Sequence, residues 1–222
     1  MSDAGSVSNG RKGRRPSPEK RRALIAAAAR LFAELGVDAA TTREIAVRAG
    51  ATERTLFKHF GSKDGLLREV MDAVSADMTP RGSAFRRVRS ETPFTRAEFA
   101  RWRRDFAQES LAAAQAAPDG CRVLFRELFR DPDFASRYAA QWMEQALRPL
   151  AAHLARMRDS GEIDAAASPE ALACAFFGLH FSYFAARFAL APGAGWDDAR
   201  DLDALALLVE TLLQPDPRAP GG

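Results

Sequence analysis

The chain has 222 residues, of which 47% are hydrophobic and 27% are charged, and it carries a formal net charge of +3 at pH 7. These values are ordinary for a globular protein and argue against wholesale disorder or a fibrous repeat. The cysteines are Cys121 and Cys174 alone, and the 3 histidines are scattered, so neither a disulfide scaffold nor a metal site is expected.

Positive charge is concentrated at the amino terminus. Residues 1–22 contain seven basic and two acidic residues, and a basic arm of this kind attracts phosphate backbones. A solubilising tail or a cloning remnant is the alternative interpretation. The segment lacks the apolar stretch of a secretory signal, and the longest nearly apolar run, residues 171–186, is shorter than a membrane span. We therefore expect a cytoplasmic protein without a transmembrane helix.

Residues 17–78 carry the start and stop signals of four helices. A Ser-Pro-Glu cap at residues 17–19 opens the first, and the pairing of Thr41 with Glu44 is the pattern of a capping box at the start of the second. Thr52 is the expected cap of the third. The helices predicted in this region cover residues 18–35, 42–49, 53–60 and 63–78.

The rest of the chain is also expected to be helical. Residues 80–93 are rich in Arg, Pro and Gly and indicate a loose connection, with a short helix around Phe85 as the alternative. A second capping box at Thr95 opens a helix that closes near residues 118–120. Further helices are predicted over 121–130, over 133–157 with a kink or break at Pro149, from 169 to about 190, and over 197–213. Strand patterns are absent, so the expected fold class is all-α.

The second and third helices are joined only by residues 49–51. A turn this short leaves no room for antiparallel packing, so the two helices must cross steeply, as in a helix-turn-helix. Gly50 tolerates the positive φ that such a turn often needs. The third helix then presents an outward face that can enter a major groove. The candidate DNA contacts are Thr42, Arg43, Glu53, Arg54, Thr55, Phe57, Lys58, His59 and Lys63.

The side chains on this face suit different parts of a duplex. Arg54 could donate to guanine, Glu53 could accept from cytosine N4, and Phe57 or Thr55 could touch a thymine methyl group. Repulsion of non-cognate sites is the alternative role for Glu53. Lysine and arginine side chains at the edges of the motif, such as Lys63, suit phosphates instead.

Several short motifs in residues 21–67 are shared with one known family. They are Ile45-Ala46, Ala49-Gly50, the run from Thr55 to Phe60, and Ser62-Lys63-Asp64. Through them the region resembles the DNA-binding head of the TetR family of transcriptional regulators. The resemblance places the family's DNA contacts on all the candidates above except Lys58. One departure is Phe57, where the family commonly has a tyrosine, so a phenolic hydrogen bond to phosphate is lost.

The resemblance also implies an architecture. A TetR-like chain is a homodimeric, all-helical repressor, in which three amino-terminal helices bind DNA, a fourth joins them to a ligand-binding body, and the last two form the dimer. On this basis we expect a basic disordered arm at residues 1–16, a helix-turn-helix DNA-binding domain at 17–62, and a helical ligand-binding and dimerisation domain at 63–222.

Aromatic residues are concentrated in the body, which holds 12 of the 15 phenylalanines and all 3 tryptophans. This is more than helix packing requires, so it favours an apolar cavity for a hydrophobic or aromatic effector, with ordinary core packing as the alternative. The candidate pocket residues are Phe99, Trp102, Phe106, Phe125, Phe129, Trp142, Phe177 and His180.

The helix that starts after Ser168 is apolar on two sides and needs two packing partners. One partner can be its own body and the other a second copy of the chain, so that the last two helices form a four-helix seam. Deep burial within one subunit is the alternative. The candidate interface residues are Cys174, Phe181, Phe184, Leu205, Leu208 and Leu212.

Together these patterns predict a ligand-responsive DNA-binding regulator. We expect a repressor that binds a palindromic operator as a homodimer and is released by a small hydrophobic or aromatic effector, with the fourth helix as the link. One alternative is a constitutive DNA-binding protein without an effector. The other is a helical enzyme, but the sequence lacks a nucleophile with a paired base, a phosphate loop and a metal cluster. No cofactor, metal, catalytic residue or membrane partner is expected.

Overall fold

The computed structural model describes residues 17–78 and 83–214, and within these ranges every regular element is a helix. The amino-terminal elements are α1 (Pro18–Leu35), α2 (Thr42–Arg48), α3 (Glu53–Phe60) and α4 (Lys63–Met78). The body contains α5 (Ser83–Val88), α6 (Arg96–Ala116), α7 (Pro118–Arg130), α8 (Pro132–Trp142), α9 (Arg148–Asp159), α10 (Pro169–Ala185) and α11 (Asp198–Leu212), with π-helical turns at Met143–Leu147 and Ala186–Leu190. The all-α fold class is confirmed. The predicted basic arm, residues 1–16, lies outside the described residues.

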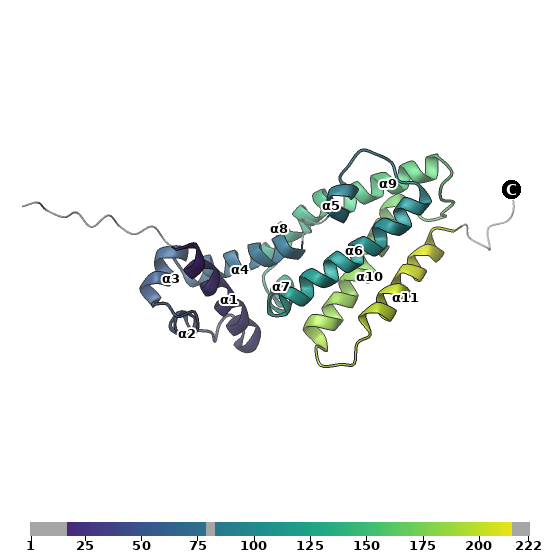
Figure 1. The fold of residues 1–222 in the computed structure, drawn as a ribbon. Helices are drawn as coiled ribbons and strands as arrows, with labels where there is room; N and C mark the ends of the chain where they lie inside the picture. The colour runs from purple at the N-terminus through teal and green to yellow at the C-terminus, as the bar shows by residue number, and fades with distance from the viewer. Residues whose placement is uncertain (1–16, 79–82, 215–222) are drawn as a thin grey trace, which may run out of the picture.

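The molecule has a small amino-terminal group of helices and a larger body. Figure 1 shows α1, α2 and α3 gathered at one end, α4 leading away from them, and α6, α10 and α11 lying along the body. We call α1–α3 the head. Helix α4 therefore leads from the head to the body.

Local sequence signals account for the ends of the head helices. The capping box predicted at α2 forms, with the Thr41 hydroxyl accepting from the backbone N–H of Glu44 at 3.2 Å. Thr52 caps α3 by accepting from the N–H of Thr55 at 3.2 Å. Gly50 has φ +60°, the left-handed conformation that the tight turn was expected to need.

One boundary in the body differs from the predictions, and the predicted kink or break at Pro149 is confirmed. The predicted turn at residues 118–120 is instead the first turn of α7, because Pro118 occupies the first helical position, where its missing N–H has no partner to lose. The long helix predicted over 133–157 is divided by the π-helical turn Met143–Leu147, directly before Pro149. Pro149 cannot donate to the preceding turn, so the hydrogen-bond pattern shifts there.

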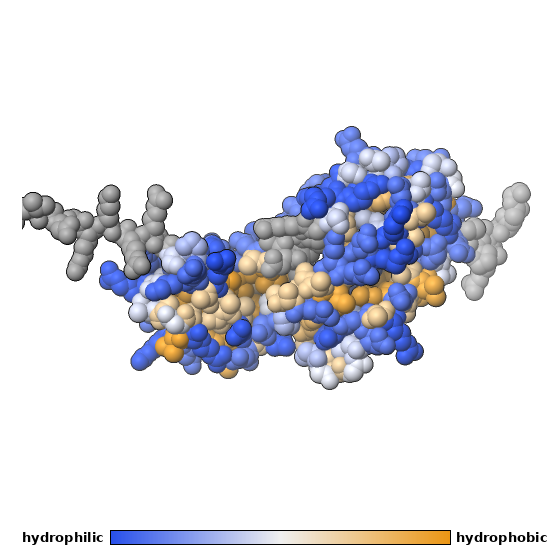
Figure 2. Space-filling model, viewed as in Figure 1, coloured by the Kyte–Doolittle hydropathy of each residue, from blue (hydrophilic) through white to orange (hydrophobic). Residues whose placement is uncertain are grey.

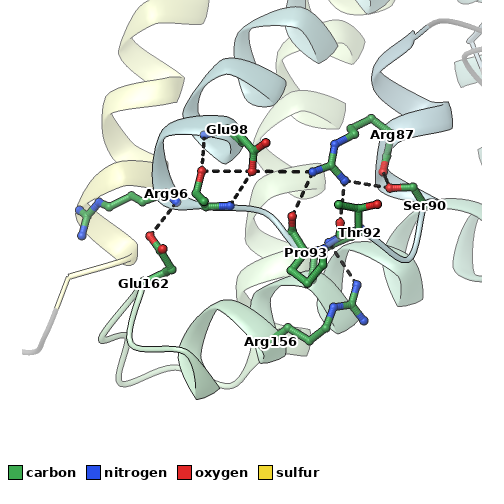
Figure 3. A network of polar contacts seen from close by, with 10 residues as sticks. Arg87, Ser90, Thr92, Pro93, Arg96, Glu98, Arg156 and Glu162 are labelled. Atoms are coloured by element: carbon green, nitrogen blue, oxygen red, sulfur yellow. Dashed lines mark hydrogen bonds and ion pairs between the residues drawn. The ribbon is translucent and has the colours of Figure 1, made fainter.

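The prediction of a loose connection is wrong for residues 83–88, which form the short helix around Phe85 given as the alternative. Residues 89–93 contain no regular element, and residues 80–82 lie outside the described residues. Figure 3 shows the guanidinium of Arg87 holding the following segment, with bonds to the carbonyl oxygens of Thr92 at 2.7 Å and Pro93 at 3.1 Å. The ring of Trp102 fixes α5 from the other side by donating to the carbonyl of Ala84 at 2.7 Å. This segment is therefore part of the body rather than a hinge.

The hydrophobic core of the head extends beyond α1–α3. It includes Leu66 and Val70 of α4 and Val123 and Leu124 of α7, all 5% exposed or less. Arg126 of α7 also donates to the carbonyl oxygens at the end of α1, to Phe32 at 3.0 Å and Ala33 at 3.4 Å. The head thus contacts the body through α7 as well as through α4.

The helix predicted from 169 to about 190 has the expected length, but it meets the composition of a membrane span. The apolar run 171–186 was expected to be too short to span a membrane, yet the helix continues over Pro169–Leu190, 22 residues, and by length and composition could cross one. It packs against α9 and α11, and 44% of its apolar window is buried. Core helices of water-soluble proteins pass the same test, so the helix is weak evidence for a membrane.

Candidate nucleic-acid interface and ligand cavity

Helix α3 has one buried and one outward face, as predicted. Leu56 is 0% exposed and packs into the core of the head, while the next residue, Phe57, is 44% exposed although it is aromatic. Arg54 and Lys58 are exposed beside it, and Arg43 is exposed on α2. A short helix that leaves a ring and cations in water has a surface suited to a polyanion with apolar base edges.

Some predicted contacts also hold the motif together. The Thr42 hydroxyl of α2 donates to the carboxylate of Glu53 at the start of α3. The hydroxyls of Thr52 and Thr55 are 2.9 Å apart. Glu53 and Thr55 therefore form hydrogen bonds within the helix-turn-helix. The bond between Thr42 and Glu53 fixes the angle between α2 and α3.

Two further candidates lie at the edge of α3. The Lys63 ammonium donates to the carbonyl of Asp38 at 3.1 Å, so it would share or exchange this bond to reach a phosphate. The pKa of His59 lies below its ordinary value, first because burial disfavours the imidazolium and then because of the nearby charges of Arg21 and Lys58. Neutral His59 can donate to a phosphate without adding charge.

Sequence reasoning missed two residues that place α3 on the molecule. A Cβ on Gly65, in the first turn of α4, would lie 2.1 Å from the carbonyl oxygen of Phe60 at the end of α3. Arg21 of α1 pairs with Glu69 of α4, and its guanidinium lies 5.8 Å from the centre of the Phe60 ring. The signal available for Gly65 was a glycine inside a predicted helix, where it lowers helix propensity and often has a packing reason.

The body has a half-open cavity of about 440 Å³ between α6, α7, α8 and α10. Five of the predicted pocket residues line it: Phe106, Phe129, Trp142, Phe177 and His180. The other three do not. Phe99 and Trp102 stack on each other with centroids 5.5 Å apart in the core, and Phe125 is 3% exposed and packs behind the cavity against Phe181. Ordinary core packing, the alternative interpretation, therefore applies to these three.

The predicted dimer residues fall into two groups. Cys174, Phe181 and Phe184 of α10 line the same cavity. On α11, Leu208 and Leu212 are 53% and 42% exposed, Leu205 is half-buried, and the neighbouring Leu207 is 72% exposed. Figure 2 shows hydrophobic residues over this part of α10 and α11, bordered by hydrophilic ones.

A second cleft of about 590 Å³ lies between α4 and the α7–α8 region. Tyr138 and Gln141 of α8 line both this cleft and the apolar cavity. Burial raises the pKa of Tyr138 to about 12, so its phenol is neutral. Helix α8 is thus the wall between the cavity and the helix that leads to the head.

Known proteins match the head most clearly. Residues 24–70 match the family described as bacterial regulatory proteins, tetR family. An HTH-type transcriptional repressor of Mycobacterium tuberculosis is 38% identical over 71 residues, which are 32% of this chain and 35% of that protein. The alignment therefore spans about a third of the length of this curated relative.

Solved structures match nearly the whole chain in fold. A TetR-like transcriptional regulator from Rhodococcus has a TM-score of 0.62 at 18% identity, covering 87% of this chain and 93% of its own. AibR, solved in complex with isovaleryl coenzyme A and operator DNA, has a TM-score of 0.62 at 17% identity, covering 89% of this chain and 100% of its own. At these identities the likeness establishes the fold.

Proposed function

We propose, from the premise that this chain is a DNA-binding transcriptional regulator of the TetR family, that it represses transcription as a homodimer on a palindromic operator and is released by a small, largely apolar effector. We place its action in the cytoplasm, where operator DNA is found. In this proposal residues 17–62 form the DNA-binding domain and residues 63–222 the effector-binding and dimerisation domain.

The observation that carries the proposal is the outward face of α3. Leu56 packs the buried side of α3 into the core of the head. On the outward face, nothing in the described chain covers Arg54 and Phe57. One such face contacts few base pairs, and two copies on half-sites about 34–36 Å apart would double the contacts and give the operator the symmetry of the protein.

The exposed leucines of α11 support the homodimer. Leu207, Leu208 and Leu212 are each more than 40% exposed, and a cluster of large apolar side chains in water favours a protein partner. A second copy of the same helix would cover them in an isologous contact. Sedimentation of the protein with and without operator measures the number of subunits per site.

The effector proposal rests on the apolar cavity and its walls. Helix α8 separates the cavity from the cleft beside α4, and α7 carries Leu128 and Phe129 at the cavity and Arg126 at the end of α1. A ligand that moves either helix would displace the head. A structure of the same fold holds a coenzyme A ester together with operator DNA, which supports ligand binding in such a body.

The DNA face can be tested by Arg54→Ala. We expect operator affinity to fall by about 1 to 2 kcal/mol, with selectivity relaxed at one base pair, because a base contact is lost while the fold is unchanged. Arg158→Ala, which removes the same charge from an exposed site on α9, should leave affinity nearly unchanged. The measurement is fluorescence anisotropy on an operator selected from a random DNA pool. Equal binding by the two variants would contradict the assignment.

The contact between α7 and the head can be tested by Arg126→Ala. The variant loses two charge-assisted bonds to carbonyls at the carboxyl end of α1, so we expect the free energy of unfolding to fall by about 1 to 2 kcal/mol and operator affinity to change with it. Arg122→Ala is the matched control on α7, because Asp119 in the same helix is the one ion-pair partner that the described residues offer Arg122. Urea unfolding compares them, and identical curves would show that Arg126 does not hold the head.

A constitutive DNA-binding protein is the second candidate. It would bind the same operator but respond to no small molecule. The cavity of about 440 Å³ favours the responsive regulator, since its size falls within the range of ligand pockets.

A further inference from the structure

We propose that the cavity of the body binds an uncharged, largely apolar molecule bearing a hydroxyl or N–H group, and that this group donates a hydrogen bond to Nε2 of His180. The inference rests on the proposed role of the body as an effector-binding domain and names the chemical class of the effector. It follows from one buried imidazole whose two nitrogens have different surroundings.

The backbone decides which nitrogen of His180 carries the proton. His180 is 5% exposed, and its Nδ1 lies 2.8 Å from the carbonyl oxygen of Phe176, one turn earlier in α10. A carbonyl oxygen only accepts, so Nδ1 must be the donor in this bond. In the neutral ring the other nitrogen, Nε2, is then a hydrogen-bond acceptor.

The imidazole is held neutral. Burial lowers the pKa of His180, and the charge of Arg103 lowers it further, while the bond to Phe176 acts in the opposite direction. Its ring is also fixed in place, with the Phe176 ring centroid 4.4 Å away and the Phe106 ring edge-on at 5.3 Å. A neutral, immobile ring presents its acceptor in one direction.

The side chain of His180 lies at the cavity, and we place its Nε2 toward the cavity because Nδ1 is bonded to the helix backbone. His180 is one of the lining residues, and no described residue forms a hydrogen bond with this nitrogen. An acceptor that borders an apolar cavity and lacks a protein donor loses free energy unless a ligand or a water molecule supplies one.

The remaining lining excludes charged ligands. None of the described residues around this cavity is Asp, Glu, Lys or Arg, and most are aromatic or aliphatic. A cation would lose its hydration without gaining a counter-ion. At His180 a carboxylate would face the lone pair of Nε2, and the other polar lining residues, Ser110, Tyr138 and Gln141, supply no positive charge. A phenol, an alcohol or a secondary amide satisfies the nitrogen and leaves its apolar part against Trp142 and Phe177.

The test compares three probes of similar shape. These are para-propylphenol, its methyl ether para-propylanisole, and para-propylbenzoate. Quenching of tryptophan fluorescence reports binding, since Trp142 lines the cavity, and calorimetry provides an independent affinity. We expect the phenol to bind about tenfold or more tightly than the ether, because the ether leaves Nε2 unpaired, and the benzoate to bind most weakly.

A pair of variants assigns the preference to His180. In His180→Phe the acceptor is gone, so the ratio of phenol to ether affinity should fall to about one. His180→Gln retains a side-chain acceptor and should keep part of the preference. If His180→Phe fails to fold, the ratio of phenol to ether affinity is measured on the unmodified protein and on His180→Gln, and these two values test the role of His180.

Equal affinity for phenol and ether, tightest binding of the benzoate, or no binding of any probe would overturn the inference. These results are separable from the proposed function. A protein that retains its operator but ignores all three probes refutes the ligand class alone. A protein that prefers the phenol through His180 but never leaves its operator when the phenol is added supports the site and refutes effector release.

Discussion

Replacing Gly65 with alanine should weaken operator binding by more than about tenfold. The added methyl would lie 2.1 Å from the carbonyl oxygen of Phe60, and a backbone oxygen cannot rotate away as a side chain can. The start of α4 must therefore move away from the end of α3. This movement breaks the bond from the Gly65 N–H to the Ser62 hydroxyl, now 2.9 Å, and tilts the outward face of α3.

The expected magnitudes follow from overpacking and from lost base contacts. We expect the free energy of unfolding to fall by about 3 kcal/mol, although alanine alone would favour the helix by about 1 kcal/mol. Operator affinity should fall by more than about tenfold, since a tilted helix loses at least one base contact. Urea unfolding and anisotropy on the selected operator measure the two effects.

Gly178→Ala is the control for this substitution. Gly178 is also inside a helix, α10, but a Cβ there would meet nothing within 4 Å. The variant should be as stable as the original chain or more stable by up to about 1 kcal/mol, with operator affinity unchanged. If Gly65→Ala behaved in the same way, the close contact between α3 and α4 would not constrain the head.

Gly120→Ala should have the second-largest effect, on the contact between α4 and α7. Its methyl would lie 2.5 Å from Cγ2 of Val74, and both residues are buried. Valine is branched at Cβ and has few rotamers to escape into. The two helices must separate, so we expect the free energy of unfolding to fall by about 2 to 3 kcal/mol.

A second substitution tests whether the contact with Val74 causes the loss of stability in Gly120→Ala. Val74→Ala removes the atoms that the new methyl would meet, so the double variant should be more stable than the sum of the two single variants predicts, by about 1 to 2 kcal/mol. A double-mutant cycle by urea unfolding measures this coupling. Simple additivity would show that the loss in Gly120→Ala arises elsewhere.

The sequence was most informative where structure is local. The capping boxes at Thr41 and Thr95 and the glycine after α1 set helix ends that the structure reproduces, because a cap involves only neighbouring residues. The same logic failed at Pro118, which was interpreted as part of a turn but begins α7. A proline ends one helix and suits the first turn of the next, so its local signal was ambiguous.

The two candidate sites differ in how far local sequence patterns could predict them. The outward face of α3 could be predicted because helical periodicity places Leu56 inward and Arg54 outward. The cavity could be predicted only as a property of the body, since Phe99, Trp102 and Phe106 share one stripe on α6 and yet only Phe106 reaches it. Periodicity gives the side of a helix but not which helix covers it.

By itself, the sequence determined the all-helical fold, the helix-turn-helix and the residues it turns outward, because these depend on hydrogen bonds and periodicities within a few turns. Only the tertiary structure decided that α7 holds the end of α1 through Arg126, that Gly65 lies against the carbonyl of Phe60, and that His180 lines the cavity. These contacts join residues from different helices or depend on what surrounds a buried ring. Their physical basis is close packing between surfaces distant in the chain, which no local pattern records.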